Sequence, residues 1–215
     1  MRRRHYLLAT TSFLGFAGCS SISSNPTETA AKTETENTDE KTARNAENMT
    51  ESQLSGHVRP TGGPWEPVKG FSCEKSNFTR HPPRYDDISW GDTENISLRI
   101  NDTAFEYGDT AQITLTNTSN RTISLGLKYM YQIELLTEDG WQDVRGKTGD
   151  DDFEYIEMST ENPPGKVFEW SLRLTEEGVV PDEKDFIVCP ELVSGRYRFV
   201  YPALEQVAVA FDLQK

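Results

Sequence analysis

The fold class is decided by two apolar runs near the C-terminus, Tyr197-Arg198-Phe199-Val200-Tyr201 and Val207-Ala208-Val209-Ala210-Phe211-Asp212-Leu213. Both runs contain the β-branched and aromatic residues that favour strands, and both are too short for a typical helix. A short polar segment separates them. The two runs therefore predict a pair of neighbouring β-strands at the end of the chain.

The same texture extends upstream, because apolar and polar residues alternate over 96–100 and again over 111–115. Further short runs that predict strands cover residues 123–125, 129–136, 141–144, 153–157 and 167–174. Asp139-Gly140 is the strongest hairpin signal, since both residues tolerate the positive φ of a type I′ turn. Turn signals recur at short intervals and no long amphipathic helix pattern interrupts them. We therefore expect an antiparallel β-sandwich or barrel rather than a βαβ enzyme core.

One local motif favours the sandwich over the barrel. Leu192, Gly195 and Tyr197 form the L-x-x-G-x-Y pattern of a tyrosine corner. In such a corner the phenol hydrogen-bonds back to upstream backbone where a late strand begins. The alternative interpretation is an ordinary junction between a loop and a strand.

Residues 94–213 resemble a bacterial-type immunoglobulin-like domain, as found in exported lipoproteins of bacteria and halophilic archaea. The matching segments are residues 113–119, Asp139-Gly140-Trp141, residues 195–199 and residues 207–213. The resemblance implies an immunoglobulin-like antiparallel β-sandwich and implies little about function, because such sandwiches have many roles. The antibody-type pair of core cysteines is missing, since Phe199 stands two residues after Tyr197.

The first residues resemble an export signal. Arg3-Arg4-His5-Tyr6-Leu7 is similar to a twin-arginine signal, and Phe16-Ala17-Gly18-Cys19 is similar to a lipobox. The resemblance implies that residues 1–18 are a signal peptide and that Cys19 carries a lipid. A simple cleaved signal and a transmembrane anchor are the alternatives. The apolar run over residues 6–18 would span only about 20 Å as a helix, which is short of a bilayer core of about 30 Å.

Residues 19–58 are dominated by Ser, Thr, Glu, Asn and Ala and hold few large apolar groups. Such a segment does not bury enough surface to offset the entropy of ordering it, so we expect a disordered tether. The expected organisation is therefore a signal peptide over 1–18, a tether over 19–58, and an immunoglobulin-like sandwich with an N-terminal extension over 59–215.

Two cysteines remain if Cys19 carries a lipid, namely Cys73 and Cys189. An even number of cysteines in an exported protein favours one disulfide, which would attach the segment around Cys73 to the sandwich. Two unpaired thiols and a metal pair are the alternatives. A metal pair is the weaker one, because histidine and further cysteine ligands are missing nearby.

The charge balance limits the partners. Lys plus Arg is 22 and Asp plus Glu is 35, so the formal net charge is −13. Such a chain repels phosphates, which argues against nucleic acid as a partner. A strongly acidic exported protein fits the surface of a halophile, where salt screens self-repulsion. An ordinary acidic secreted protein is the alternative.

The sequence contains six N-x-S/T patterns, more than its Ser and Thr content predicts by chance. They are at Asn48, Asn77, Asn95, Asn101, Asn117 and Asn120. Glycan acceptors of this kind lie on surface loops. The alternative is a turn composition rich in Asn and Thr, since both residues favour turns.

Few residues point to chemistry. The cluster of Asp150, Asp151, Asp152 and Glu154 is a weak Ca²⁺ candidate without EF-hand spacing, and a solvated acidic loop is the simpler interpretation. His57 and His81 stand without a nucleophile motif, so we expect neither catalysis nor a cofactor. The tryptophans are candidates for a binding surface, apart from Trp170, which lies in an apolar run and is expected in the core. They are Trp65, Trp90, Trp141 and Trp170.

These patterns support two hypotheses of different class. The first is a non-enzymatic, lipid-anchored protein on the outer face of the cell membrane, whose immunoglobulin-like domain binds a protein or an envelope glycan. The second is an accessory or stabilising lipoprotein of a membrane export or uptake complex. A hydrolase is a remote third, and it would require His and Asp side chains that converge in a pocket.

Overall fold

The computed structural model describes residues 54–63, 66–83, 87–149, 153, 158–203 and 205–215. These residues contain no α-helix, so the all-β class is confirmed. The strands are β1 (Phe78–Arg80), β2 (Ser89–Trp90), β3 (Ile96–Ile100), β4 (Ala104–Glu106), β5 (Thr110–Asn117), β6 (Ile123–Gly126), β7 (Gln132–Thr137), β8 (Gly140–Asp143), β9 (Arg145–Thr148), β10 (Ser159–Asn162), β11 (Val167–Arg173), β12 (Ile187–Val188), β13 (Gly195–Pro202) and β14 (Gln206–Gln214).

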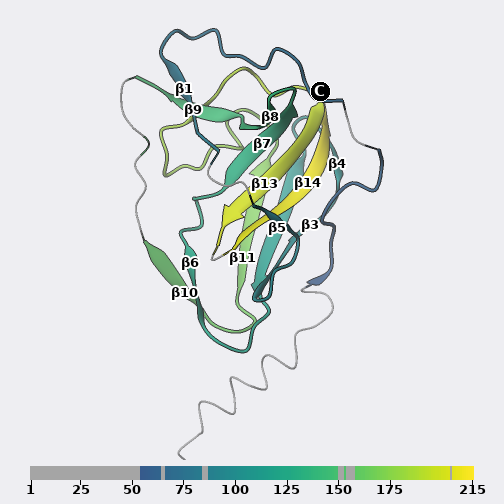
Figure 1. Cartoon of the computed structure of the whole chain (residues 1–215), viewed down its shortest axis with the longest axis vertical. Helices are drawn as coiled ribbons and strands as arrows, with labels where there is room; N and C mark the ends of the chain where they lie inside the picture. The colour runs from purple at the N-terminus through teal and green to yellow at the C-terminus, as the bar shows by residue number, and fades with distance from the viewer. Residues whose placement is uncertain (1–53, 64–65, 84–86, 150–152, 154–157, 204) are drawn as a thin grey trace, which may run out of the picture. The chain divides into compact units, whose positions relative to one another are not determined.

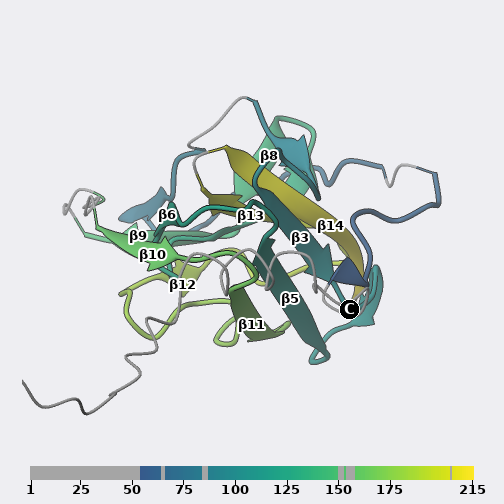
Figure 2. The same cartoon turned by 90° about the horizontal axis from the view of Figure 1, so that it is seen from below.

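Two sheets form the sandwich (Figure 1). The larger sheet has the order β2-β14-β13-β7-β8, and β4 also pairs with β14. The smaller sheet has the order β11-β5-β3 and lies on one side of the β13–β14 hairpin in Figure 2. All the pairings are antiparallel except those of β2 and β4, which run parallel to β14. The predicted antiparallel sandwich is therefore confirmed.

The core fills the space between the two sheets. Because side chains alternate along a strand, one face of β13 contributes Tyr197, Phe199 and Tyr201. The smaller sheet contributes Leu115 and Trp170, and the Trp170 and Phe199 ring centroids lie 5.0 Å apart. Burial of each large apolar side chain stabilises the fold by about 1.5–3 kcal/mol. The prediction that Trp170 belongs to the core is confirmed.

The hairpin predicted at Asp139-Gly140 is present and joins β7 to β8, but the type I′ turn is not formed: Gly140, the first residue of β8, has a φ of +95°, whereas Asp139 does not have a positive φ. The smallest elements were not predicted. They are β1, β9 and β12 of one further sheet, β10 of another, and β2 and β4 of the larger sheet, whereas β6, the partner of β10, was predicted over residues 123–125. Segments of two to four residues are too short for an alternating pattern to stand out from a loop.

The outer edge of β14 is completed by three separate segments. Trp90 of β2 is the register partner of Ala208, and β4 pairs with residues 212–214. Between them, the Ala210 N–H donates a hydrogen bond of 2.8 Å to the Val58 carbonyl. His57 pairs through its backbone with Ile100 of the smaller sheet. Residues 57–61, here called the strap, therefore connect the two sheets along one side of the sandwich.

The strap corrects one predicted boundary. The tether was expected to continue to residue 58, but His57 and Val58 already belong to the fold. Their pairing uses backbone groups, so it needs no apolar side-chain pattern. Residues 1–53 lie outside the described residues, and a disordered tether over 19–53 stays a prediction.

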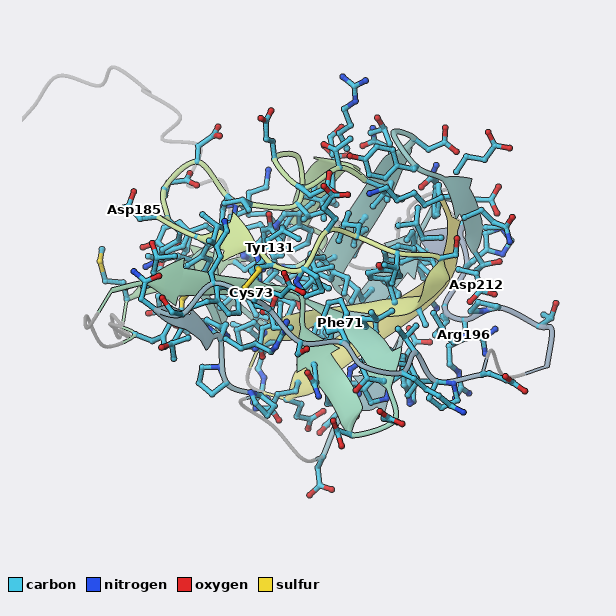
Figure 3. The ribbon with its side chains drawn as sticks, turned by 90° about the horizontal axis from the view of Figure 1, so that it is seen from above. Phe71, Cys73, Tyr131, Asp185, Arg196 and Asp212 are labelled. Carbon is cyan, nitrogen blue, oxygen red and sulfur yellow. A yellow bond between two sulfur atoms is a disulfide. The ribbon has the colours of Figure 1, made fainter. Side chains whose placement is uncertain are left out.

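A second N-terminal segment, residues 71–81, is here called the arm. A disulfide joins Cys73 to Cys189, with Cα atoms 5.2 Å apart, so the predicted bridge is present (Figure 3). Strand β1 of the arm pairs with β9, and the Cys189 N–H donates to the Val144 carbonyl at 3.1 Å. The arm is therefore attached both covalently and through a sheet.

Candidate functional site

The outer face of the larger sheet, opposite the core, carries an alternating set of polar and aromatic side chains. Tyr197 and Phe199 point into the core, so their neighbours Arg196 and Arg198 face outward. On the adjacent strands, Glu134 and Ala210 are the register partners of Arg198 and lie on the same face. The strap lies beside this face at the edge of β14, where the Ala210 N–H donates to the Val58 carbonyl.

An open cleft of about 600 Å³ lies between the strap and this face. Its volume is within the range of small-molecule sites. Two indoles and two guanidinium groups line it, and the described lining contains no acidic residue. The lining residues are Val58, Arg59, Pro60, Thr61, Trp90, Leu136, Trp141, Arg196 and Ala210. We call it the arginine–tryptophan cleft.

The two indoles come from different strands and meet in the cleft. Trp90 lies on β2 and Trp141 on β8, with ring centroids 6.4 Å apart and an interplanar angle of 56°. Both side chains are half-buried. The Arg59 guanidinium carbon lies 5.1 Å from the Trp90 centroid, and that of Arg198 lies 4.5 Å from the Trp141 centroid. These cation–π contacts hold both rings in place.

Two of the nearby arginines are neutralised by the sheet. Arg196 forms a bidentate pair with Asp212 at 2.8 and 3.0 Å, and its hydrogen bond to that carboxylate raises the pKa of Arg196. Figure 3 shows the pair side by side. Arg198 is buried and paired with Glu134. Burial lowers the pKa of Arg198 and raises that of Glu134, although each partner's charge opposes the shift of the other.

Arg59 differs from both, because its side chain is exposed and makes no ion pair with any residue that the structure describes. It is held by Trp90 alone, through the cation–π contact. The cleft therefore presents one uncompensated positive charge beside two aromatic rings. The described lining offers no carboxylate, imidazole or thiol.

A second cluster does bring His and Asp together, on the side of the molecule that holds the arm. The His81 Nδ1 atom lies 3.6 Å from the Asp143 carboxylate and 2.8 Å from the Gln132 amide nitrogen. Asp143 also accepts two hydrogen bonds from the Arg145 guanidinium, at 2.9 and 2.8 Å, and one from the Arg145 backbone N–H at 3.0 Å. Burial disfavours the charge on Arg145, but the Asp143 carboxylate outweighs it and raises the pKa of Arg145.

This cluster is closed to solvent. Asp143 and Arg145 are fully buried, and His81 is 5% exposed with Phe153 and Phe186 against its ring. A general base must reach its substrate, and this imidazole is enclosed. His81 and Asp143 do lie close together, as a hydrolase would require, but they belong to a buried ion-pair network and not to a pocket. This network packs the arm against the sandwich.

The tyrosine corner has the expected hydrogen bond. The Tyr197 hydroxyl donates to the Val193 carbonyl at 2.8 Å and accepts from the Val193 N–H at 3.1 Å. Gly195 is required there, because a Cβ atom would lie 2.8 Å from a Leu135 methyl group. Leu192 is buried in the core beside it. The motif therefore anchors the loop that leads into β13.

The structure separates the predicted glycan acceptors. Asn77, Asn101 and Asn120 are exposed, and Asn95 is half-buried with its side-chain oxygen 3.4 Å from Arg121. Whether glycans are attached stays a prediction. Asn48 lies outside the described residues, as do Cys19, Trp65 and the whole acidic cluster of Asp150, Asp151, Asp152 and Glu154. Among the described residues, no group of three or more His, Cys, Asp or Glu side chains has the arrangement of a metal site.

The prediction for Asn117 is wrong. Its side chain is fully buried, and its amide nitrogen donates to the backbone carbonyls of Arg121 and Asn162 at 2.9 and 2.7 Å. Its side-chain oxygen accepts from the Ser119 N–H at 2.9 Å. A glycan would need that nitrogen and open space around it, and neither is free in this fold. The Asn117 side chain organises the turn after β5 instead.

The sequence analysis missed Arg59, Arg196 and Arg198. The two arginines of β13 alternate with core aromatics, so their outward position was readable from the strand pattern. Arg59 carried no signal, because it directly follows the expected tether and no strand pattern surrounds it.

Comparison with known proteins gives no family for the chain. No protein-family model matches it, and no curated protein matches it. The described part of the chain contains no helix with the length and apolar character needed to cross a bilayer.

Proposed function

We propose that the protein is a non-enzymatic, lipid-anchored cell-surface protein whose immunoglobulin-like sandwich binds a component of the cell envelope in the arginine–tryptophan cleft. The observation that carries the proposal is the convergence of Arg59, Trp90 and Trp141 around an open cleft. Aromatic and arginine side chains are the residues that dominate binding energy at protein recognition sites.

The location rests on the sequence. The twin-arginine and lipobox patterns indicate export and a lipid on Cys19, and the acidic composition suits a salty exterior. The strap follows the expected tether directly, and its residues form one wall of the cleft. In this proposal, residues close in sequence to the tether contribute to the binding site.

The structure supports a binding role over an enzymatic one in a specific way. The described cleft lining holds cations and aromatic rings, whereas the His81–Asp143 contact is buried elsewhere. An accessory role in an export or uptake complex remains the alternative function. It differs in its partner, which would be a stoichiometric membrane complex.

The experiment measures sedimentation of the full-length chain with cell envelopes from which detergent has removed the lipids, so that the anchor does not contribute. Mass spectrometry of the same preparation identifies the N-terminus. We expect a lipid-modified Cys19 and envelope binding that Trp141→Ala weakens at least tenfold. Arg173→Gln, which removes an exposed arginine of β11, is the control and should bind normally.

Two results would contradict the proposal. One is the absence of envelope binding by the wild-type chain. The other is equal binding by wild type and the cleft variant, together with recovery of a stoichiometric membrane complex from crosslinked cells, which would support the accessory role.

A further inference from the structure

We infer that the arginine–tryptophan cleft recognises an acidic sugar, a uronic-acid unit of an envelope glycan, with its carboxylate on Arg59 and its ring against Trp90 and Trp141. This inference rests on the proposed function and specifies its ligand. It is carried by the charge, the ring geometry and the backbone pairing of the cleft.

The first step concerns charge. The chain has a net charge of −13, yet no acidic residue is among the described residues that line the cleft. Asp212 and Glu134 face arginines of the sheet and neutralise them. Of these three arginines, only Arg59 makes no ion pair with a described residue. On a chain with an acidic net charge, an unpaired cation beside two aromatic rings favours an anionic ligand at the cleft.

The second step concerns the type of anion group. A guanidinium is planar and donates two parallel hydrogen bonds to a carboxylate while its face rests on an aromatic ring. Arg59 already lies over the Trp90 ring, so its side chain is oriented before a ligand arrives. Loss of side-chain freedom on binding is therefore smaller than for an arginine in free solution.

The third step concerns the rest of the ligand. Two indoles tilted by 56°, with centroids 6.4 Å apart, offer apolar surfaces at two orientations in one cleft. A pyranose ring has faces made of C–H groups that pack on such surfaces, while its carboxylate and hydroxyls stay at the polar rim. A ligand that joins a carboxylate to a compact ring with apolar faces matches both parts of the cleft.

The backbone around the cleft argues against an extended acidic peptide. Peptides that add to a sheet need a row of unpaired backbone groups. Here the Leu136 carbonyl already accepts from the Val68 N–H, and the Ala210 N–H already donates to the Val58 carbonyl. Because these backbone groups are in use, recognition falls to the side chains, as in a sugar site.

The experiment uses isothermal titration calorimetry on the full-length chain in detergent. The probes are a galacturonic-acid pentamer, a neutral galactose pentamer and a glutamate pentapeptide. We expect the acidic pentamer to bind at least tenfold more tightly than the other two. Arg59→Gln should lower its affinity at least tenfold, and Trp90→Leu should also lower it. Arg173→Gln removes the same charge outside the cleft and should leave the affinity within twofold.

Each other outcome overturns the inference. Equal binding of the neutral pentamer would remove the role of Arg59, and equal or tighter binding of the glutamate peptide would indicate an acidic protein partner. If Trp90→Leu fails to fold, the exposed Arg59 variant still decides. Absence of uronate binding with retained envelope sedimentation overturns the ligand class alone, whereas loss of both overturns the proposed function as well.

Discussion

The strap and the arm are two N-terminal segments that pack on the sandwich by different means. Each carries an arginine over an aromatic ring, Arg59 over Trp90 in the strap and Arg80 over Phe71 at 4.6 Å in the arm. Arg80 also donates to the Asp143 carbonyl at 2.7 Å, so its guanidinium is used within the fold. Arg59 has no such partner among the described residues.

The difference extends to the whole of each segment. The arm is fixed by a disulfide, a small sheet and the buried Asp143–Arg145 pair. The strap is fixed by backbone hydrogen bonds of His57 and Val58. A buried polar group must be satisfied inside the protein, and the Arg80 and His81 side chains of the arm accordingly have their partners within the fold. The strap leaves its side chains at the surface, and there the cleft forms.

The largest expected effect comes from removing the covalent link of the arm. The disulfide closes a segment of 116 residues, and in the chain-entropy model it stabilises the fold by about 4–5 kcal/mol. The double variant Cys73→Ala/Cys189→Ala should lose about that amount in urea unfolding. Ligand binding in the cleft, measured where the variant is still folded, should be unchanged. A parallel loss of cleft affinity would show that the two segments are coupled.

The strap is tested at Gly91, where a Cβ atom would lie 2.5 Å from a Val58 methyl carbon and φ is +74°. Gly91→Ala should cost about 3 kcal/mol, from backbone strain and from displacing the strap. Gly108→Ala is the matched control, because φ is +93° there and no atom lies within 4 Å. It should cost about 1 kcal/mol. Thermal unfolding of both variants measures the difference in stability. An equal loss of stability in the two variants would mean that Val58 of the strap does not pack tightly against Gly91.

The same contrast explains how far the sequence could predict this molecule. Long strands such as β5, β13 and β14 can be predicted from the sequence, because the side chains that fill the core leave a pattern of apolar residues. The tyrosine corner and the disulfide follow from single residues with specific chemistry. The strap does not, since backbone pairing leaves no pattern in the side chains, and the predicted end of the tether at residue 58 therefore fell inside the strap.

Asn117 shows the opposite limit. The residues that make an N-x-S acceptor also make an Asn-centred turn, because both need an amide followed by a hydroxyl two residues later. Only burial separates the two. The cleft also could not be predicted, since its lining comes from the strap and from five strands, β2, β7, β8, β13 and β14.

The two arginines can be compared directly by removing each guanidinium. Arg80→Gln should destabilise the fold by about 2 kcal/mol, because it removes a charged, partly buried hydrogen bond to the Asp143 carbonyl. Arg59→Gln should change the free energy of unfolding by less than about 0.5 kcal/mol, as an exposed side chain does. Urea unfolding of both variants measures the difference. A comparable loss for Arg59→Gln would assign it a structural role and weaken the case for a ligand.

The smallest effect concerns Tyr131, which lies under Arg145 on the arm side. Burial raises the pKa of Tyr131 to about 12, whereas an unfolded phenol ionises near pH 10. Between these values the unfolded chain releases a proton that the folded chain keeps, so stability falls as pH rises above 10. At pH 11 the contribution is about 1.4 kcal/mol.

The measurement is urea unfolding at pH 9 and pH 11 for wild type, Tyr131→Phe and Arg59→Gln. The phenylalanine variant should lose less stability over this interval than wild type, by about the stated amount, while Arg59→Gln should follow wild type. Tyr197 and Tyr201, whose pKa values burial also raises, contribute equally to all three proteins and cancel in the comparison. An unchanged pH dependence in Tyr131→Phe would mean that water reaches this phenol. The region around the arm would then be as accessible to solvent as the arginine–tryptophan cleft.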